Sequence, residues 1–322
     1  MVGLTGATGK TTTKDILVAM LRAAGVAVQG SLGNRNTEVG VPMSLLDLDE
    51  GCEVAVIEMG MRGLGQIAEL AALAPPDVAC ITGVGPVHLE LLGTVEAVAR
   101  AKAEILAALR PGGAAVVPAD EPLLEPFIGA LDSGVRVIRF GDRPDLTLDM
   151  SLSKAWELRD AAAALACCVA LGTPPAEGAR IEVEISGLRG QEREIPGGGL
   201  LIEDCYNANP LAMRAALADL AGRPGRRVAV LADMMELGPE EERFHREVGA
   251  AAAAGGIDLL IGVGERAAGY VAGADGLATE HVATVDAALD RVPELLEPGD
   301  VVLLKGSRSM RLERLGAVIA PS

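Results

Sequence analysis

The residues best suited to catalyse a reaction lie at the start of the sequence, in TGATGKTTT (5–13). Phosphate oxygens are bound by backbone N–H groups, which glycine allows to approach closely, by the start of a helix and by a cation. Lys10 would neutralise the β- and γ-phosphates of a nucleotide, and the Thr11 hydroxyl would bind Mg²⁺. Leu4 stands where the general pattern GxxxxGK[ST] has glycine, and a turn that is merely tight is the alternative. We predict a phosphate-binding loop made of Thr5, Gly6, Ala7, Thr8, Gly9, Lys10, Thr11 and Thr12.

Two further polar residues follow predicted buried strands. Glu58 ends EVAVIE (53–58), and His88 comes shortly after DVACIT (77–82). Ligands of open α/β sheets bind at the carboxyl ends of the strands, where Glu58 could hold a hard cation. We expect His88 to lie beside the loops that carry Lys10 and Glu58. The alternatives are a helix-capping or loop acid for Glu58 and a structural histidine for His88.

Lys102 lies in a helix-forming stretch rich in Ala and Glu (94–109). Lysines of helices are usually solvated, and spacing alone favours that interpretation for Lys102. The residues around it therefore assign it no chemistry.

The sequence alternates short apolar runs with helical stretches, which predicts doubly wound parallel sheets and an α/β fold. In the first half we expect helices at 12–24, 94–109 and 156–171 and strands at 53–58, 77–82, 114–118 and 136–140. In the second half we expect helices from 210 and at 240–254, with strands at 199–204, 226–233, 258–264, 281–285 and 300–306. The apolar helix ends before GTPPAEG, and we place the boundary between two domains there, at 1–175 and 176–322.

Composition narrows the classes of protein. Of 322 residues 50% are hydrophobic and only 2% aromatic, so Ala, Val, Leu and Ile must fill the core. The net charge of −17 argues against nucleic-acid binding, which needs a basic surface. We see no signal peptide or bilayer-spanning stretch and expect a soluble cytoplasmic protein. We expect buried free thiols rather than a metal or disulfide framework at Cys52, Cys80, Cys167, Cys168 and Cys205.

Several segments together resemble the Mur ligases of peptidoglycan synthesis, in particular the members that join D-Ala-D-Ala to UDP-MurNAc-tripeptide. The resemblance implies a P-loop-type, mostly parallel central ATPase domain followed by a Rossmann-like C-terminal domain. It also implies a monomer that binds ATP and Mg²⁺. The segments are TGATGKTTTKD (5–15), GNRNTEVGVP (33–42), EMGMRGLGQIAEL (58–70), VGPVHLELLGTVEAVARAKAEI (84–105), DCYNANPLAMRAAL (204–217), ADMMELG (232–238) followed by His245, and LKGSRSMRLE (304–313).

By this resemblance, ATP phosphorylates a peptide carboxylate and an incoming amine attacks the acyl phosphate. Lys10 and Thr11 would hold the phosphates and a first Mg²⁺, with Glu58 as a metal ligand. His88 would bind a second Mg²⁺, and Lys102 would carry a carbamate derived from CO₂.

The resemblance assigns further residues to binding. In the second domain the nucleotide would contact Asp204, Tyr206, Asn207 and Asn209. The substrate side would be lined by Asn34, Asn36 and Thr37. The incoming dipeptide or the closure of the domain would involve Lys305, Gly306, Ser307 and Arg308, although solvated loop residues are the alternative for these four.

The sequence departs from the family pattern in several places. We expect the family's N-terminal domain, which grips the UDP part of the substrate, to be missing, and the stretch before the 156–171 helix is short. Asp160 and Gly83 stand where the family has asparagine. Two alternatives remain: a sister ligase, such as one that adds glutamate to folate, and a degenerate nucleotide-binding partner without ligase activity.

Overall fold

The computed structural model describes residues 1–33 and 35–321. It forms two compact units, Met1–Ser186 and Gly187–Ser322, here called unit 1 and unit 2. The division lies later than the boundary that we placed after residue 175. The reason is a short parallel pair between β7 (Asp149–Met150) and β8 (Arg180–Ile181), which ties the chain after residue 175 to unit 1.

Unit 1 is built on a sheet of six parallel strands in the order β2-β3-β1-β4-β5-β6. The strands are β1 (Val2–Thr5), β2 (Val28–Gly30), β3 (Val54–Glu58), β4 (Val78–Ile81), β5 (Ala114–Pro118) and β6 (Arg136–Phe140). The helices are α1 (Lys10–Ala23), α2 (Gly40–Leu46), α3 (Gln66–Leu73), α4 (Leu89–Leu92), α5 (Val95–Ala107), the 3₁₀ turn η1 (Pro122–Leu124), α6 (Glu125–Ile128) and α7 (Ala155–Leu171).

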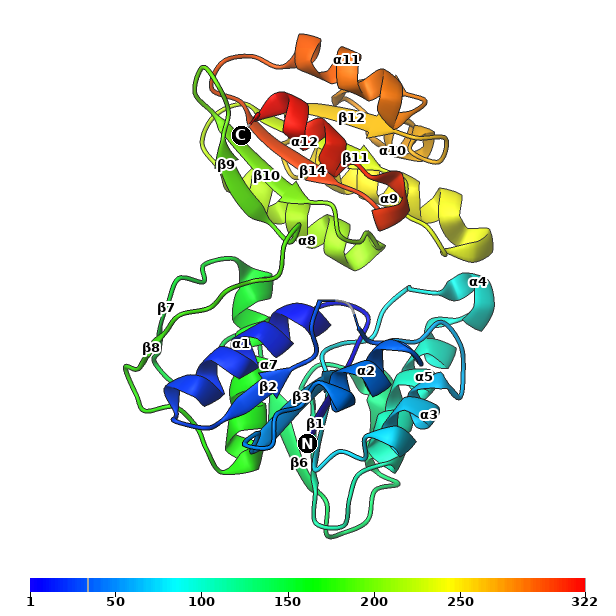
Figure 1. The fold of residues 1–322 in the computed structure, drawn as a ribbon. Coiled ribbons are helices and arrows are strands. Elements are labelled where there is room, and N and C mark those ends of the chain that lie inside the picture. The colour runs from blue at the N-terminus through cyan, green and yellow to red at the C-terminus, as the bar shows by residue number, and fades with distance from the viewer. Residues whose placement is uncertain (34, 322) are drawn as a thin grey trace. The chain divides into compact units, whose positions relative to one another are not determined.

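Helices cover both faces of this sheet, with α1 and α7 on one side and α3 and α5 on the other (Figure 1). Alternate residues of a strand point to opposite faces, so Val2 and Leu4 join the core under α1 and α7. A Cβ at Gly3 would lie 3.0 Å from Ile105 of α5, on the other face. The sheet is therefore buried on both sides, which explains its uninterrupted apolar strands.

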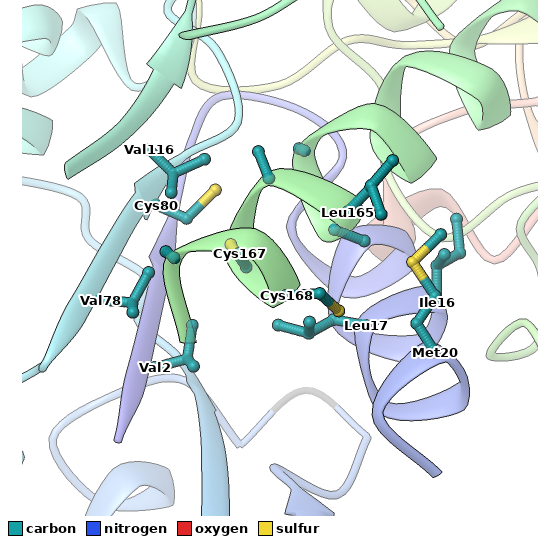
Figure 2. Close-up of a cluster of buried hydrophobic side chains, with 14 of the residues drawn as sticks. Val2, Ile16, Leu17, Met20, Val78, Cys80, Val116, Leu165, Cys167 and Cys168 are labelled. Atoms are coloured by element: carbon teal, nitrogen blue, oxygen red, sulfur yellow. The ribbon is translucent and has the colours of Figure 1, made fainter. Parts of the chain in front are cut away.

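The core under α7 consists of small and aliphatic side chains (Figure 2). Cys167 of α7 faces Cys80 and the strands, whereas Cys168 lies beside Leu17 of α1. Four of the five cysteines are buried, Cys52 is half-buried, and all five are free thiols, as the sequence predicts. Just before the helix, the Lys154 ammonium lies 5.6 Å from the ring centroid of Trp156.

Unit 2 holds a second sheet of six strands in the order β13-β12-β11-β14-β10-β9. All its pairs are parallel except β9 with β10. The strands are β9 (Gln191–Glu194), β10 (Leu200–Asp204), β11 (Arg227–Ala232), β12 (Leu259–Val263), β13 (Ala278–Val282) and β14 (Val301–Lys305). The helices are α8 (Pro210–Ala221), η2 (Gly238–Glu240), α9 (Glu241–Ala254), α10 (Ala268–Gly273), α11 (Val285–Leu295), η3 (Arg308–Met310) and α12 (Glu313–Ile319).

The predicted α/β class with mostly parallel sheets is confirmed. One strand prediction is wrong: the strand expected at 281–285 is β13, Ala278–Val282. The Thr284 hydroxyl accepts a hydrogen bond from the Ala287 N–H (3.2 Å) and begins α11, so the strand must end before it. Within the described ranges, every helix is too short or too polar to cross a bilayer.

Candidate functional site

The strand order of unit 1 brings the predicted loops to one edge of the sheet. β1 lies between β3 and β4, with Leu4 paired to Glu58 and Thr5 paired to Ile81. Glu58 ends β3, Lys10 begins α1 directly after the loop that follows β1, and His88 lies in the loop after β4, so the three come from neighbouring strand ends. This adjacency of strand ends is the one that the sequence led us to expect.

The loop between β1 and α1 has glycine where neighbouring atoms leave no room for a side chain. Gly9 precedes α1 with φ 80°, and a Cβ there would lie 2.2 Å from Oδ1 of Asp160. A Cβ at Gly6 would lie 1.9 Å from Oγ1 of Thr82. Lys10 Nζ donates to the Gly6 carbonyl (2.9 Å), so its ammonium folds back over the loop. Backbone N–H groups and a cation thus meet at the start of a helix, which is the chemistry that binds phosphate.

Glu58 is buried, and uncharged groups donate to both of its carboxylate oxygens. Thr11 Oγ1 donates to Oε2 (2.7 Å) and Asn36 Nδ2 donates to Oε1 (2.7 Å). Two uncharged donors therefore hold the Glu58 carboxylate beside the phosphate-binding loop. The Glu58 carboxylate and the Thr11 hydroxyl offer the oxygen ligands that Mg²⁺ prefers. These residues fit a Mg²⁺ that takes its other ligands from phosphate and water.

The described part of the chain holds no group of three or more His, Cys, Asp or Glu side chains arranged for a metal ion. His88 is half-buried and precedes α4 with φ 54°, a left-handed conformation that is uncommon outside glycine. Its loop starts beside the phosphate-binding loop, because the Ala7 N–H donates to the Gly83 carbonyl (2.9 Å).

Lys102 is not the solvated lysine that helical spacing favours. It projects from α5 into the interior and is only 2% exposed. Burial, and secondly the positive charge of Lys10, hold the pKa of Lys102 well below its usual value. Among residues 1–33 and 35–321, no carboxylate pairs with its amine. A lowered pKa makes the amine of Lys102 neutral at a lower pH, and a neutral amine is a nucleophile.

The segment expected to contact substrate gives a mixed result. Asn36 donates to Glu58, and its carbonyl accepts from the Gly60 N–H (2.6 Å). The exposed Thr37 accepts from the Val41 N–H at the start of α2 (2.9 Å). Asn34 lies outside the described residues. The structure therefore gives Asn36 a place beside Glu58 that the sequence did not predict.

Three residues that the sequence analysis gave no role support this site. Thr82 Oγ1 donates to the Thr8 carbonyl, and the Ser31 hydroxyl accepts from the Glu58 N–H (3.1 Å). The buried Lys14 donates to the Ser31 carbonyl (2.8 Å). Lys14 lies one helical turn after Lys10, and this spacing could have indicated that it shares a helix face with Lys10. Within the loop itself, the hydroxyl of Thr5 is buried without a hydrogen-bond partner, and Thr12 is buried in the first turn of α1.

Unit 2 carries its own group of polar residues at the ends of β10 and β14. The buried Lys305 pairs with Asp204, its register partner (Nζ–Oδ2 2.5 Å), and donates to the Asn207 carbonyl (3.2 Å). The Asn209 side chain caps α8 by accepting from the Ala212 N–H (3.0 Å). Beside them, the guanidinium of Arg189 lies 3.9 Å from the ring centroid of Tyr206.

The loop after β14 packs against the end of β11. A Cβ at Gly306 would lie 2.6 Å from the Cβ of Ala232, so only glycine fits this approach. Ser307 Oγ accepts from the Met235 N–H (3.0 Å), whereas the exposed Arg308 pairs with Glu313. The predicted residues Lys305, Gly306 and Ser307 are thus fixed by unit 2 itself.

Two family descriptions match this chain. Residues 4–166 match the Mur ligase middle domain, and residues 189–308 match the Mur ligase, glutamate ligase domain.

Curated relatives carry the name UDP-N-acetylmuramoyl-tripeptide–D-alanyl-D-alanine ligase. The protein from Bacillus subtilis is 33% identical over 98% of this chain and 74% of its own length. The protein from Synechocystis is 35% identical over 99% of this chain and 74% of its own length.

Solved structures of MurF proteins are similar to this chain as well. MurF from Acinetobacter baumannii superposes with a TM-score of 0.88 at 29% identity, covering 99% of this chain and 76% of its own. MurF from Thermotoga maritima, solved in complex with ADP, has a TM-score of 0.84 at 30% identity, covering 99% and 78%.

Proposed function

The chain belongs to the Mur ligase family, and on that premise we propose that it joins D-Ala-D-Ala to UDP-MurNAc-tripeptide at the expense of ATP. The curated relatives at 33% and 35% identity carry this activity in their names. The observation that carries the proposal is the hydrogen bond between Thr11 of the phosphate-binding loop and the buried Glu58. It joins a nucleotide loop to a carboxylate suited to a metal ion.

The reaction follows from the weakness of a carboxylate as an electrophile. A carboxylate oxygen of the tripeptide attacks the γ-phosphorus of ATP, the bond from this phosphorus to the bridging oxygen breaks, and ADP leaves. The dipeptide nitrogen then attacks the acyl carbon, the bond from carbon to the phosphate oxygen breaks, and the nitrogen gives up a proton. The products are an amide, ADP and phosphate.

The residues of unit 1 divide the tasks of phosphoryl transfer. We assign the phosphates to the loop of residues 5–12 and to the ammonium of Lys10, while the Ala7 N–H fixes this loop to the Gly83 carbonyl. Thr11 and Glu58 would hold one Mg²⁺, and His88 would hold a second. Bound Mg²⁺ screens negative charge on the transferring phosphoryl group and on the attacking carboxylate.

Lys102 supplies a further anion after reaction with CO₂. Its neutral amine attacks the carbon of CO₂ and the nitrogen releases one proton, so that a carbamate anion replaces the amine. The buried side chain without a carboxylate partner supports this step, since a permanent ammonium would be unfavourable there. The carbamate oxygens would be additional ligands of the kind that hard cations prefer.

The remaining assignments concern binding. In unit 2 we assign Asp204, Tyr206, Asn207 and Asn209 to the nucleotide and Lys305, Ser307 and Arg308 to the incoming dipeptide. In unit 1 we assign Asn34, Asn36 and Thr37 to the substrate side, with Asn36 also orienting Glu58.

A phosphate-release assay tests the proposal. Purified protein receives ATP, Mg²⁺, bicarbonate, UDP-MurNAc-tripeptide and D-Ala-D-Ala, and the product is identified by mass. We expect phosphate release that requires both the tripeptide and the dipeptide. Release that is independent of the dipeptide, or no release, would contradict the ligase assignment.

A further inference from the structure

His245 is a buried histidine whose tautomer is set by its neighbours. Its side chain is 0% exposed, near the start of α9. Nε2 receives the N–H of Met234 (3.1 Å), so this nitrogen must be an unprotonated acceptor. Nδ1 lies 2.7 Å from the carbonyl of Glu241, a group that only accepts, and must therefore carry the proton. The ring is neutral, with its hydrogen on Nδ1.

Met234, whose N–H is bonded to His245, lies between two residues that contact the loop after β14. The Met235 N–H donates to the Ser307 hydroxyl (3.0 Å), and the Ser307 N–H donates to the Asp233 carbonyl (3.2 Å). Met234 stands between Asp233 and Met235, and its N–H is the group bonded to His245. A change in this bond would therefore move both contacts to Ser307.

The surroundings of the ring allow it little freedom. The rings of His245 and Tyr270 have centroids 4.7 Å apart, and the Tyr270 hydroxyl donates to the Ala232 carbonyl (3.0 Å). A Cβ at Gly269 would lie 2.7 Å from the Cβ of His245, so α10 packs directly on α9 at this point. The ring cannot rotate away from Met234 without displacing α10.

The charged groups around the ring come from the loops after β11 and β12 and from α9. Arg266 donates to Glu241 (2.8 Å) and lies 3.9 Å from Asp233. Burial lowers the pKa of His245 below its usual value, while the bond to the Glu241 carbonyl and the charges of Asp233 and Glu241 act in the opposite direction. A proton on Nε2 would face the Met234 N–H, donor against donor, and would break the contact.

We propose that His245 is a positioning residue for the Ser307 loop: as a neutral acceptor it fixes residues 233–235 and, through the Met235–Ser307 hydrogen bond, the Ser307 hydroxyl. This inference rests on the proposed function, in which the loop of Ser307 contacts the incoming dipeptide. His245 touches no substrate. It acts on the affinity for the dipeptide through Ser307.

Two amide variants distinguish the hydrogen bond made by Nε2 from the hydrogen bond made by Nδ1. His245→Gln keeps an acceptor that reaches the Met234 N–H, whereas the shorter His245→Asn keeps only the local bond to Glu241. We expect His245→Asn to raise the KM for D-Ala-D-Ala about tenfold with kcat changed less than about threefold. His245→Gln should stay within about threefold of the wild type in both constants.

The matched control is His281→Asn, because His281 is also in unit 2 and its Nε2 lies 2.7 Å from the Gly264 carbonyl. It should leave the KM for the dipeptide unchanged. In a Ser307→Ala background, His245→Asn should add almost nothing, since both changes remove the same hydroxyl contact. Full additivity, or equal KM values for the Asn and Gln variants, would overturn the proposal.

A readout without activity separates this inference from the proposed function. We expect hydrogen exchange at the Met235 amide to be about tenfold faster in His245→Asn than in His245→Gln. Equal exchange in the two variants would overturn the positioning role even in an active ligase. Faster exchange in a protein without dipeptide-dependent phosphate release would support the role and count against the proposed function alone.

Discussion

Two lysines are among the largest fully buried side chains of this protein, Lys102 in unit 1 and Lys305 in unit 2, and each is 2% exposed. Lys305 has the carboxylate of Asp204 at 2.5 Å and the carbonyl of Asn207 at 3.2 Å. Lys102 has no carboxylate partner within the described residues, and burial and, secondly, the positive charge of Lys10 lower its pKa. Burial of a charge without a partner is unfavourable. The carboxylate beside Lys305 therefore favours an ammonium, whereas the surroundings of Lys102 disfavour one.

The difference indicates what each site can do. At the ends of β10 and β14 the charges of Asp204 and Lys305 compensate each other, so this pair links the two strand ends. In unit 1, the side chains of Thr11 and Asn36 that donate to Glu58 are uncharged, and burial lowers the pKa of Lys102. The edge of the first sheet is thus the place where cations and a modified lysine would satisfy groups that the protein leaves uncompensated.

The largest effect that we expect comes from Lys102. Lys102→Ala should lower dipeptide-dependent phosphate release by about 10²–10³-fold, because it removes an anionic ligand of the metal site. Acetate or formate at high concentration should restore part of the activity by replacing the carbamate. Intact mass measured in bicarbonate should exceed the sequence mass by one CO₂ in the wild type alone.

The control for Lys102 is Arg100→Ala, an exposed residue of the same helix, which should retain its activity. Full activity in Lys102→Ala would refute the carbamate.

The next effect concerns the paired lysine. Asp204→Asn would leave the ammonium of Lys305 buried without a countercharge, and we expect it to destabilise unit 2 by about 3 kcal/mol. The measurement is urea unfolding, with hydrogen exchange at β10 and β14 to locate the change. Asp219→Asn, which removes a surface pair with Arg223, should cost less than about 0.5 kcal/mol. Equal effects of the two variants would show that the Asp204–Lys305 pair has no special weight.

The smallest expected effect is the change in stability when a buried lysine is replaced by methionine, and its sign differs between the two units. Lys102→Met should stabilise unit 1 by about 1 kcal/mol at pH 7 in CO₂-free buffer, whereas Lys305→Met should destabilise unit 2. The pKa of Lys102 is lowered on folding, so between the folded value and 10.5 the unfolded chain binds the extra proton. Wild-type stability therefore rises with pH across this window, and the advantage of Lys102→Met should shrink as pH approaches 10.5.

Urea midpoints measured from pH 7 to 10 check this sign. A constant or growing advantage of Lys102→Met would mean that Lys102 keeps its ammonium in the folded protein.

The strands and the phosphate-binding loop could be predicted because each leaves a pattern within a short stretch of the sequence. Buried parallel strands produce apolar runs, and glycine next to Lys10 marks a phosphate loop, so the strand ends could be placed beside one another. The strand at 278–282 was misplaced because alternation in HVATV continues into residues that begin α11. Asn209 directly before Pro210 could have been identified as a helix cap from its sequence.

The parts that could not be predicted depend on contacts between distant segments. Nothing near Lys102 in the sequence indicates that its face of α5 is turned into the protein. The bonds from Asn36 to Glu58 and from Lys14 to Ser31 join residues whose spacing carries no signal. Such contacts are decided by the order of strands in the sheet, which no single segment specifies.

The scarcity of aromatic residues makes the two units optically distinct. The sole tryptophan, Trp156, begins α7 in unit 1, and both tyrosines, Tyr206 and Tyr270, belong to unit 2. Excitation at the red edge of the ultraviolet band therefore excites unit 1 alone, with the Lys154 ammonium near the emitting ring. A fluorescence titration with a nucleotide, without any label, would report on the half of the chain that carries the phosphate-binding loop.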